Sequence, residues 1–221
     1  MDAAKLEVLF LQNYGDCATM KKNFRRTAMK KLLITGFDPC DGQTINPSWE
    51  ALRLLPEIIG DFELCKLQLP TCYGVAPEIL LEKAEEIRPC VIISVGQAGG
   101  RANVTPERIA VNIRDSKRAD NSGRVCSGER IDVNGDAAFF STLPVEAMAE
   151  AICAAGLPGA VSNTAGTFVC NDVLYNALRS FKGTKTLAGF IHVPYLPEQG
   201  EPNLPLTDTV RALIAAIEAI S

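Results

Sequence analysis

Two residues of this 221-residue chain could together activate a nucleophile, namely Cys170 and His192. His192 is the only histidine, so acid–base catalysis by an imidazole near neutral pH must use it. Cys170 follows the small, polar run 162–167 and lies near the start of a predicted helix, where backbone N–H groups and the helix dipole favour a thiolate. A thiolate with an imidazole partner indicates acyl transfer or amide hydrolysis.

An acidic residue that orients the imidazole would complete a catalytic triad. The chain offers Glu107, Asp172 and Glu198 as candidates, and residue types alone do not choose among them. A purely structural interpretation also exists for each member. A thiol often packs in a core, a strand-end histidine can bond to backbone, and most carboxylates are solvated.

The glycine-rich segment 96–101 (Gly-Gln-Ala-Gly-Gly-Arg) could suggest a phosphate-binding loop. Its spacing matches neither the dinucleotide fingerprint nor the P-loop, and no helix clearly follows it. Tight turning of the backbone close to a ligand is the simpler interpretation of these glycines.

The elements that must position these residues alternate between strand and helix, which predicts an α/β fold with a mostly parallel sheet and helices on both faces. In such sheets, functional groups gather at the carboxyl ends of the strands. Three strand ends carry turn-forming and polar residues, at 36–39, 96–100 and 192–195. The expected strands are 32–34, 63–69, 90–95, 108–113, 160–163 and 187–193, and the expected helices are 47–55, 77–87, 144–155, 168–181 (with Thr167 as N-cap) and 207–220.

Composition excludes several classes of protein. The chain is 47% hydrophobic, has a net charge of −4 and contains no apolar run long enough to span a membrane. Neither nucleic acid nor a membrane is therefore expected as a partner. The eight cysteines form no Cys-x-x-Cys pair, and a single histidine allows no zinc-finger spacing. Reduced thiols in the cytoplasm are expected, with no metal site.

The segment 1–28 is basic and differs in character from the acidic remainder of the chain. It lacks the uninterrupted apolar stretch and cleavage site of a secretory signal. We expect it to be an N-terminal extension outside the core fold, followed by one catalytic domain over 29–221.

Five motifs in order make the chain resemble the pyroglutamyl-peptidase I (pyrrolidone-carboxylate peptidase) family of cysteine peptidases. The resemblance covers about residues 29–220. The motifs are Gly-Phe-Asp-Pro (36–39) with Asn-Pro-Ser (46–48), Gly-Gln-Ala-Gly-Gly-Arg (96–101), Pro-Glu-Arg-Ile-Ala (106–110), Ser-Asn-Thr-Ala-Gly-Thr-Phe-Val-Cys-Asn (162–171) and Phe-Ile-His-Val-Pro-Tyr-Leu-Pro-Glu-Gln (190–199).

The resemblance implies a three-layer α/β/α domain that removes an N-terminal pyroglutamyl residue from small peptides. It implies an enzyme without metal or cofactor, in the cytoplasm, commonly a homotetramer. Its triad falls on Cys170 as nucleophile, His192 as general base and acid, and Glu107 as the imidazole's partner. Its substrate pocket falls on Phe37 and Phe168, whose rings would sandwich the lactam, on the backbone of Gln97, and on Asn46, which would hold the pocket loop.

Two departures from the family pattern concern the substrate pocket. Cys40 stands where the family usually has Phe, and Asp41 stands where it usually has Gly. Losing an aromatic wall predicts weaker substrate binding with the chemistry retained. An arginine common in the family aligns with Lys117, and Arg118 lies beside it, so either base could take that role.

Two other functions are consistent with the sequence. The chain could be another thiol-dependent amidase or thioesterase on the same scaffold, because of the altered residues 40 and 41. It could also be a non-catalytic binder of lactam ligands, although the intact Cys170, His192 and Glu107 argue against that. The glycines alone support nucleotide binding only weakly.

Overall fold

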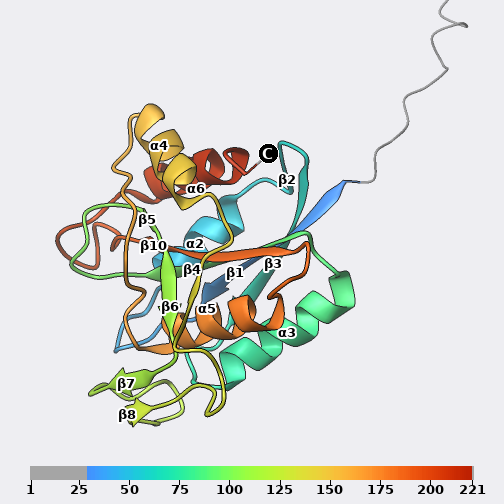
Figure 1. Cartoon of the computed structure of the whole chain (residues 1–221). Helices are drawn as coiled ribbons and strands as arrows, with labels where there is room; N and C mark the ends of the chain where they lie inside the picture. Colours follow the sequence, from blue (N-terminus) through green and yellow to red (C-terminus); the bar gives the residue numbers. More distant parts are fainter. Residues whose placement is uncertain (1–28, 221) are drawn as a thin grey trace, which may run out of the picture.

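The computed structural model describes residues 29–220, which form a sheet between two layers of helices (Figure 1). The six-stranded sheet has the order β2-β3-β1-β4-β10-β5. Its central strands are parallel to one another, and β2 and β5 pair antiparallel at the two edges. The predicted three-layer α/β/α fold with a mostly parallel sheet is confirmed. The predicted extension 1–28 lies outside the described residues.

The helices cover the two faces of the sheet unequally. Helices α2, α4 and α6 pack on one face, whereas α3 and α5 pack on the other (Figure 1). The strands of the main sheet are β1 (Lys30–Phe37), β2 (Ile58–Ile59), β3 (Phe62–Leu69), β4 (Val91–Gln97), β5 (Thr105–Pro106) and β10 (Leu187–Val193). The helices are α2 (Pro47–Leu54), α3 (Val75–Ile87), α4 (Val145–Ala154), α5 (Val169–Ser180) and α6 (Leu206–Glu218).

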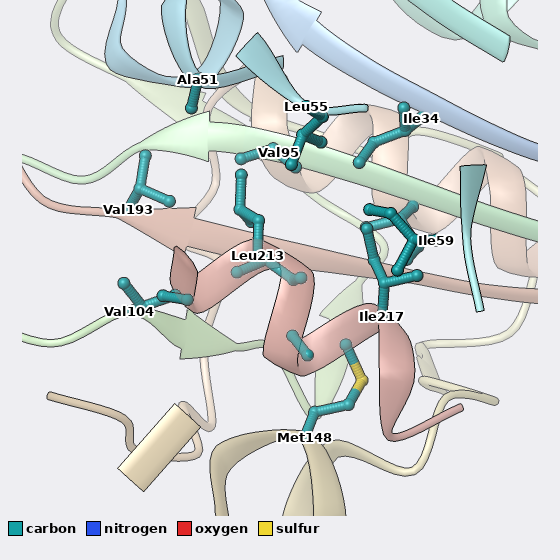
Figure 2. Packing of buried hydrophobic residues seen from close by; sticks show 14 of the residues in the cluster. Ile34, Ala51, Leu55, Ile59, Val95, Val104, Met148, Val193, Leu213 and Ile217 are labelled. Carbon is teal, nitrogen blue, oxygen red and sulfur yellow. The ribbon is translucent and has the colours of Figure 1, made fainter. Parts of the chain in front are cut away.

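The middle portions of β1, β4 and β10 are mostly apolar because both of their faces are buried. Successive side chains of a strand point to opposite faces. Accordingly, Leu32 and Ile34 of β1 join the core under α2, α4 and α6, whereas Leu33 joins the core under α3 and α5. Figure 2 shows the first core, with Leu213 and Ile217 of α6 packed in it.

The segment 96–135, expected to be irregular apart from a strand at 108–113, contributes to two small antiparallel sheets. Strand β6 (Ile109–Val111) pairs with β9 (Ala138–Phe140), and β7 (Arg114–Ser116) pairs with β8 (Cys126–Glu129). Strand β6 lies within the predicted strand 108–113, whereas the other three are too short to leave a periodic pattern in the sequence. The β7–β8 pair protrudes beyond the layers (Figure 1).

Two local predictions are wrong. The strand expected at 160–163 is absent, and Ser162 instead makes an isolated bridge with Glu107. The N-cap of α5 is Phe168 rather than Thr167, because the Thr167 hydroxyl donates to the backbone oxygen of Asp115 at 2.6 Å. Both differences have the same cause. Ser162 and Thr167 contact the segment 105–115, which is distant in sequence, instead of forming a strand or capping the helix that follows.

Candidate active site

The sheet register places Cys170 beside His192. His192 of β10 pairs with Gly96 of β4, so the side-chain positions of the two residues face the same side of the sheet. A Cβ atom added to Gly96 would lie 3.0 Å from the Sγ of Cys170, the second residue of α5. The thiol therefore occupies the space left by the missing side chain. Cys170 and His192 line one cavity of about 340 Å³.

The imidazole of His192 is bonded to Glu107. The distance between His192 Nδ1 and Glu107 Oε1 is 2.7 Å, and both side chains are buried, Glu107 completely. Burial alone would raise the pKa of Glu107. Hydrogen bonds from His192, Ser162 and Arg101, with the charge of the imidazole when it is protonated, outweigh burial and hold that pKa below its ordinary value. Glu107 is therefore a carboxylate at neutral pH.

The other two candidate acids lie elsewhere. Asp172 is buried, and its Oδ1 accepts from the Arg114 guanidinium at 2.8 and 3.0 Å, while its Oδ2 accepts from the backbone of Gly74. Glu198 is exposed in the loop after β10. Of the three carboxylates, only Glu107 contacts the imidazole.

Desolvation favours the neutral form of the half-buried Cys170 thiol. This effect, followed by the nearby Cys40 and Glu107, raises the pKa of Cys170 to about 12. The sequence predicted a thiolate from the helix N-terminus, but desolvation outweighs that effect. A nucleophilic thiolate at this position must therefore form by transferring its proton to a neighbouring base.

A second cavity, of about 120 Å³, shares Cys170, Gln97 and Phe168 with the first. Phe37, Phe168, Gln97 and Asn46, all expected in the substrate pocket, line it together with Cys170. Phe168 is fixed by an edge-on contact with Tyr73, at 5.3 Å between ring centroids. Two aromatic walls beside a thiol make a pocket suited to a small, flat and uncharged ring.

Asn46 holds the wall of this second cavity together. It is the N-cap of α2, where its Oδ1 accepts from the backbone N–H of Ser48 at 3.1 Å. Its Nδ2 donates to the backbone oxygen of Asp38 at 2.9 Å. Asn46 is 3% exposed, so both groups are satisfied inside the protein. One side chain thus joins the start of α2 to the loop after β1.

The departures at residues 40 and 41 fall in the wall of this cavity. Cys40 lines it, and Asp41 forms an ion pair with Arg118 at 2.7 Å. The Arg118 guanidinium lies over the Phe168 ring, 5.7 Å from its centroid. Arg118 lines both cavities, while Lys117 is exposed beside it. Of the two bases that could take the family's arginine role, Arg118 is the one that reaches the site.

Sequence reasoning missed two groups of residues at this site. Arg101 contacts Glu107 directly, and its only signal was its place in the motif 96–101. Asp38 accepts from the backbone and hydroxyl of Thr71, both at 2.7 Å, and from Asn121, which fixes the loop beside Phe37. These contacts join segments far apart in the chain, so spacing does not reveal them.

Two further observations limit the functions that residues 29–220 can perform. Within this part of the chain, no group of three or more His, Cys, Asp or Glu side chains is placed to hold a metal ion. None of its helices is long and apolar enough to cross a membrane.

An α/β/α protein that gathers a thiol, an imidazole and a carboxylate at the ends of its strands belongs to the class in which a cysteine can act as nucleophile. The family model for pyroglutamyl peptidase matches residues 30–221. The chain therefore belongs to the pyroglutamyl peptidase family.

Individual relatives agree with this assignment. The pyrrolidone-carboxylate peptidase of Levilactobacillus brevis is 50% identical over 197 residues, covering 86% of this chain and 97% of its own. That of Erwinia tasmaniensis is 46% identical over 195 residues, covering 86% and 92%. The crystal structure of pyroglutamyl peptidase I from Bacillus amyloliquefaciens superposes with a TM-score of 0.83 at 43% identity, covering 86% of this chain and 95% of that one.

Proposed function

We propose that this protein is a cysteine peptidase that hydrolyses the amide bond after an N-terminal pyroglutamyl residue. Membership of the pyroglutamyl peptidase family supports the activity. The observation that carries the assignment of residues is the buried 2.7 Å contact between His192 and Glu107 beside the Cys170 thiol. We assign Cys170 as nucleophile, His192 as general base and acid, and Glu107 as the residue that orients the imidazole.

The reaction begins with proton transfer from Cys170 to Nε2 of His192, because Nδ1 faces Glu107. The resulting thiolate attacks the carbonyl carbon that joins pyroglutamate to the next residue, and a carbon–sulfur bond forms. Backbone N–H groups at the start of α5 stabilise the oxyanion. Collapse of this intermediate breaks the carbon–nitrogen bond, and His192 gives its proton to the leaving amine. Water, deprotonated by His192, then hydrolyses the thioester and releases free pyroglutamate.

The smaller cavity supplies the specificity for pyroglutamate. The lactam ring is flat and uncharged, so it fits between Phe37 and Phe168 with its N–H and carbonyl bonded to the backbone at Gln97. An ordinary N-terminus carries an ammonium group, and burying that charge between aromatic rings is costly. The larger cavity, which His192 lines, receives the peptide after the scissile bond.

Compartment and assembly are part of the same proposal. A thiol nucleophile requires reducing conditions, so we propose that the protein acts in the cytoplasm. Seven cysteines of residues 29–220 are unbridged, which is consistent with this compartment. We also propose a homotetramer, because the resemblance implies one, and light scattering of the purified protein tests it.

A panel of matched dipeptide amides tests the activity and its alternatives. Pyroglutamyl-alanine amide should be cleaved, whereas prolyl- and glutaminyl-alanine amides should be left intact, with products identified by mass spectrometry. Cleavage of the other amides, or of thioesters alone, would indicate a different thiol-dependent hydrolase. A rise in Tm with pyroglutamate and no cleavage of any substrate would indicate a lactam-binding protein.

A further inference from the structure

The Arg101 guanidinium shares an acceptor with the imidazole of His192. Arg101 Nη1 lies 2.6 Å from Glu107 Oε1, the same oxygen that lies 2.7 Å from His192 Nδ1. Nη1 also donates to the hydroxyl of Thr105, and Nη2 donates to the backbone oxygen of Thr164, both at 2.9 Å. Arg101 therefore joins the loop after β4 to the Glu107 segment and to the loop that leads into α5.

The charge of Glu107 depends on Arg101. Glu107 is fully buried, and its second oxygen, Oε2, has no hydrogen-bond partner within the described part of the chain. Both basic partners of this carboxylate therefore meet it at Oε1. In residues 29–220, Arg101 and His192 are the two basic side chains paired with it. Because an uncompensated buried carboxylate is unfavourable, at least one of these two bases must carry a positive charge.

Arg101 is always protonated, so it supplies that charge and leaves the imidazole free to remain neutral. Without Arg101, the buried pair would be balanced by a bound proton, either on Glu107, which then no longer stabilises a charged imidazole, or on the imidazole itself. A protonated imidazole cannot accept the proton of Cys170. We propose that Arg101 is a positioning residue that holds Glu107 as a carboxylate while keeping His192 neutral and ready to act as a base. This inference rests on the proposed function of the three residues.

Other charged groups near His192 contribute less. Cys170, Asp115 and Arg118 line the same cavity as His192. The Cys170 thiol is neutral, Asp115 is exposed to solvent, and Arg118 is exposed and paired with Asp41. Solvent screens the exposed groups, whereas the Arg101–Glu107 pair is shielded at its carboxylate end.

The single histidine makes a direct test possible, since its Hε1 proton gives one imidazole resonance in the proton NMR spectrum. We would follow this resonance against pH in the full chain carrying Cys170→Ala, which removes the coupled thiol. Arg101→Gln should raise the titration midpoint by about one pH unit or more. Arg101→Lys, which keeps the charge, should raise it less. Arg211→Gln, which removes an exposed arginine paired with Asp208 on α6, should leave it unchanged.

The active enzyme gives a second readout. In Arg101→Gln with Cys170 intact, the acid limb of kcat/KM should move to higher pH with the NMR midpoint, so that activity recovers as the pH is raised. A folded Arg101→Gln protein with an unmoved midpoint, or with an equal loss of activity at every pH, would overturn the proposal. The NMR result does not depend on turnover, so it remains informative even if the protein proves not to be a pyroglutamyl peptidase.

Arg101→Gln places a neutral amide beside the buried Glu107 carboxylate, so this variant could fail to fold. The comparison is then made between Glu107→Gln and the double variant Glu107→Gln/Arg101→Gln, which bury no lone carboxylate. Removal of the guanidinium should again raise the midpoint, because a positive charge near the imidazole is lost. Equal midpoints in these two variants would refute the role of Arg101.

Discussion

The Sγ atom of Cys170 fills the space where the side chain of Gly96 would be, 3.0 Å from the position of its missing Cβ. Gly96 is also the register partner of His192. Because Gly96 of β4 has no side chain, the N-terminus of α5 can approach the sheet next to the imidazole of His192. The catalytic pair that we propose depends on this close approach rather than on any local feature of α5.

Gly96→Ala should inactivate the enzyme. The added methyl group would lie 2.7 Å from the Phe190 ring as well as against Cys170, so the ring or the thiol must move. A displacement of about 1 Å at a reacting atom costs on the order of 10²-fold in rate. We expect a fall of this size in kcat, measured beside Tm. Unchanged kcat in the folded variant would show that the thiol does not need this space.

The neutral thiol can be observed by titration. Because burial raises the pKa of Cys170 to about 12, the thiol stays protonated as the pH rises through the ordinary cysteine value of 9.0. The difference in thiolate absorbance near 240 nm between wild type and Cys170→Ala should therefore show no step between about pH 7 and pH 10. A step in that range would mean that the resting enzyme holds a thiolate, as the helix N-terminus alone had suggested.

Asn46 offers a way to separate helix capping from pocket support. Asn46→Ala removes both contacts and should lower the free energy of unfolding by about 1 kcal/mol and raise KM. Asn46→Ser keeps an uncharged capping oxygen but loses the donor to Asp38, so it should keep most of the stability and still raise KM. Denaturant unfolding and steady-state kinetics measure the two effects. Equal KM values for wild type and Asn46→Ser would remove Asn46 from the pocket.

Cys40 tests whether the substrate cavity lacks an aromatic wall. Cys40→Phe should lower KM about 2- to 10-fold for a pyroglutamyl substrate, the range expected for one added aromatic contact. Cys40→Ser, a change of similar size without a ring, should not lower it. An unchanged or higher KM for Cys40→Phe would show that the Asp41–Arg118 pair has replaced the wall rather than left it open.

The sequence predicts the layers of this fold well because the central strands are buried on both faces. The run 91–95 is apolar except for Ser94 for that reason, and its prediction needs no knowledge of its neighbours. Of the small pairs β6–β9 and β7–β8, only β6 was predicted, because each strand has three or four residues and a partner distant in sequence.

The candidate site is only partly predictable for the same reason. Cys170 and His192 could be selected as the helix-start thiol and the single histidine. Glu107 could not be distinguished from Asp172 by residue type, because the difference lies in their partners, His192 for one and Arg114 for the other. Arg101 was part of a recognised motif, but its role depends on contacts with two separate segments, at 105–107 and 162–164.

Fluorogenic turnover tests the central assignment most directly. Purified protein would be assayed with pyroglutamyl-aminomethylcoumarin under reducing conditions, with Cys170→Ala as the test variant and Cys153→Ala, an exposed cysteine, as the matched control. Wild type and Cys153→Ala should release the fluorophore at similar rates, and Cys170→Ala should be slower by at least about 10³-fold. Turnover by folded Cys170→Ala at the wild-type rate, or no turnover by folded wild type, would contradict this account.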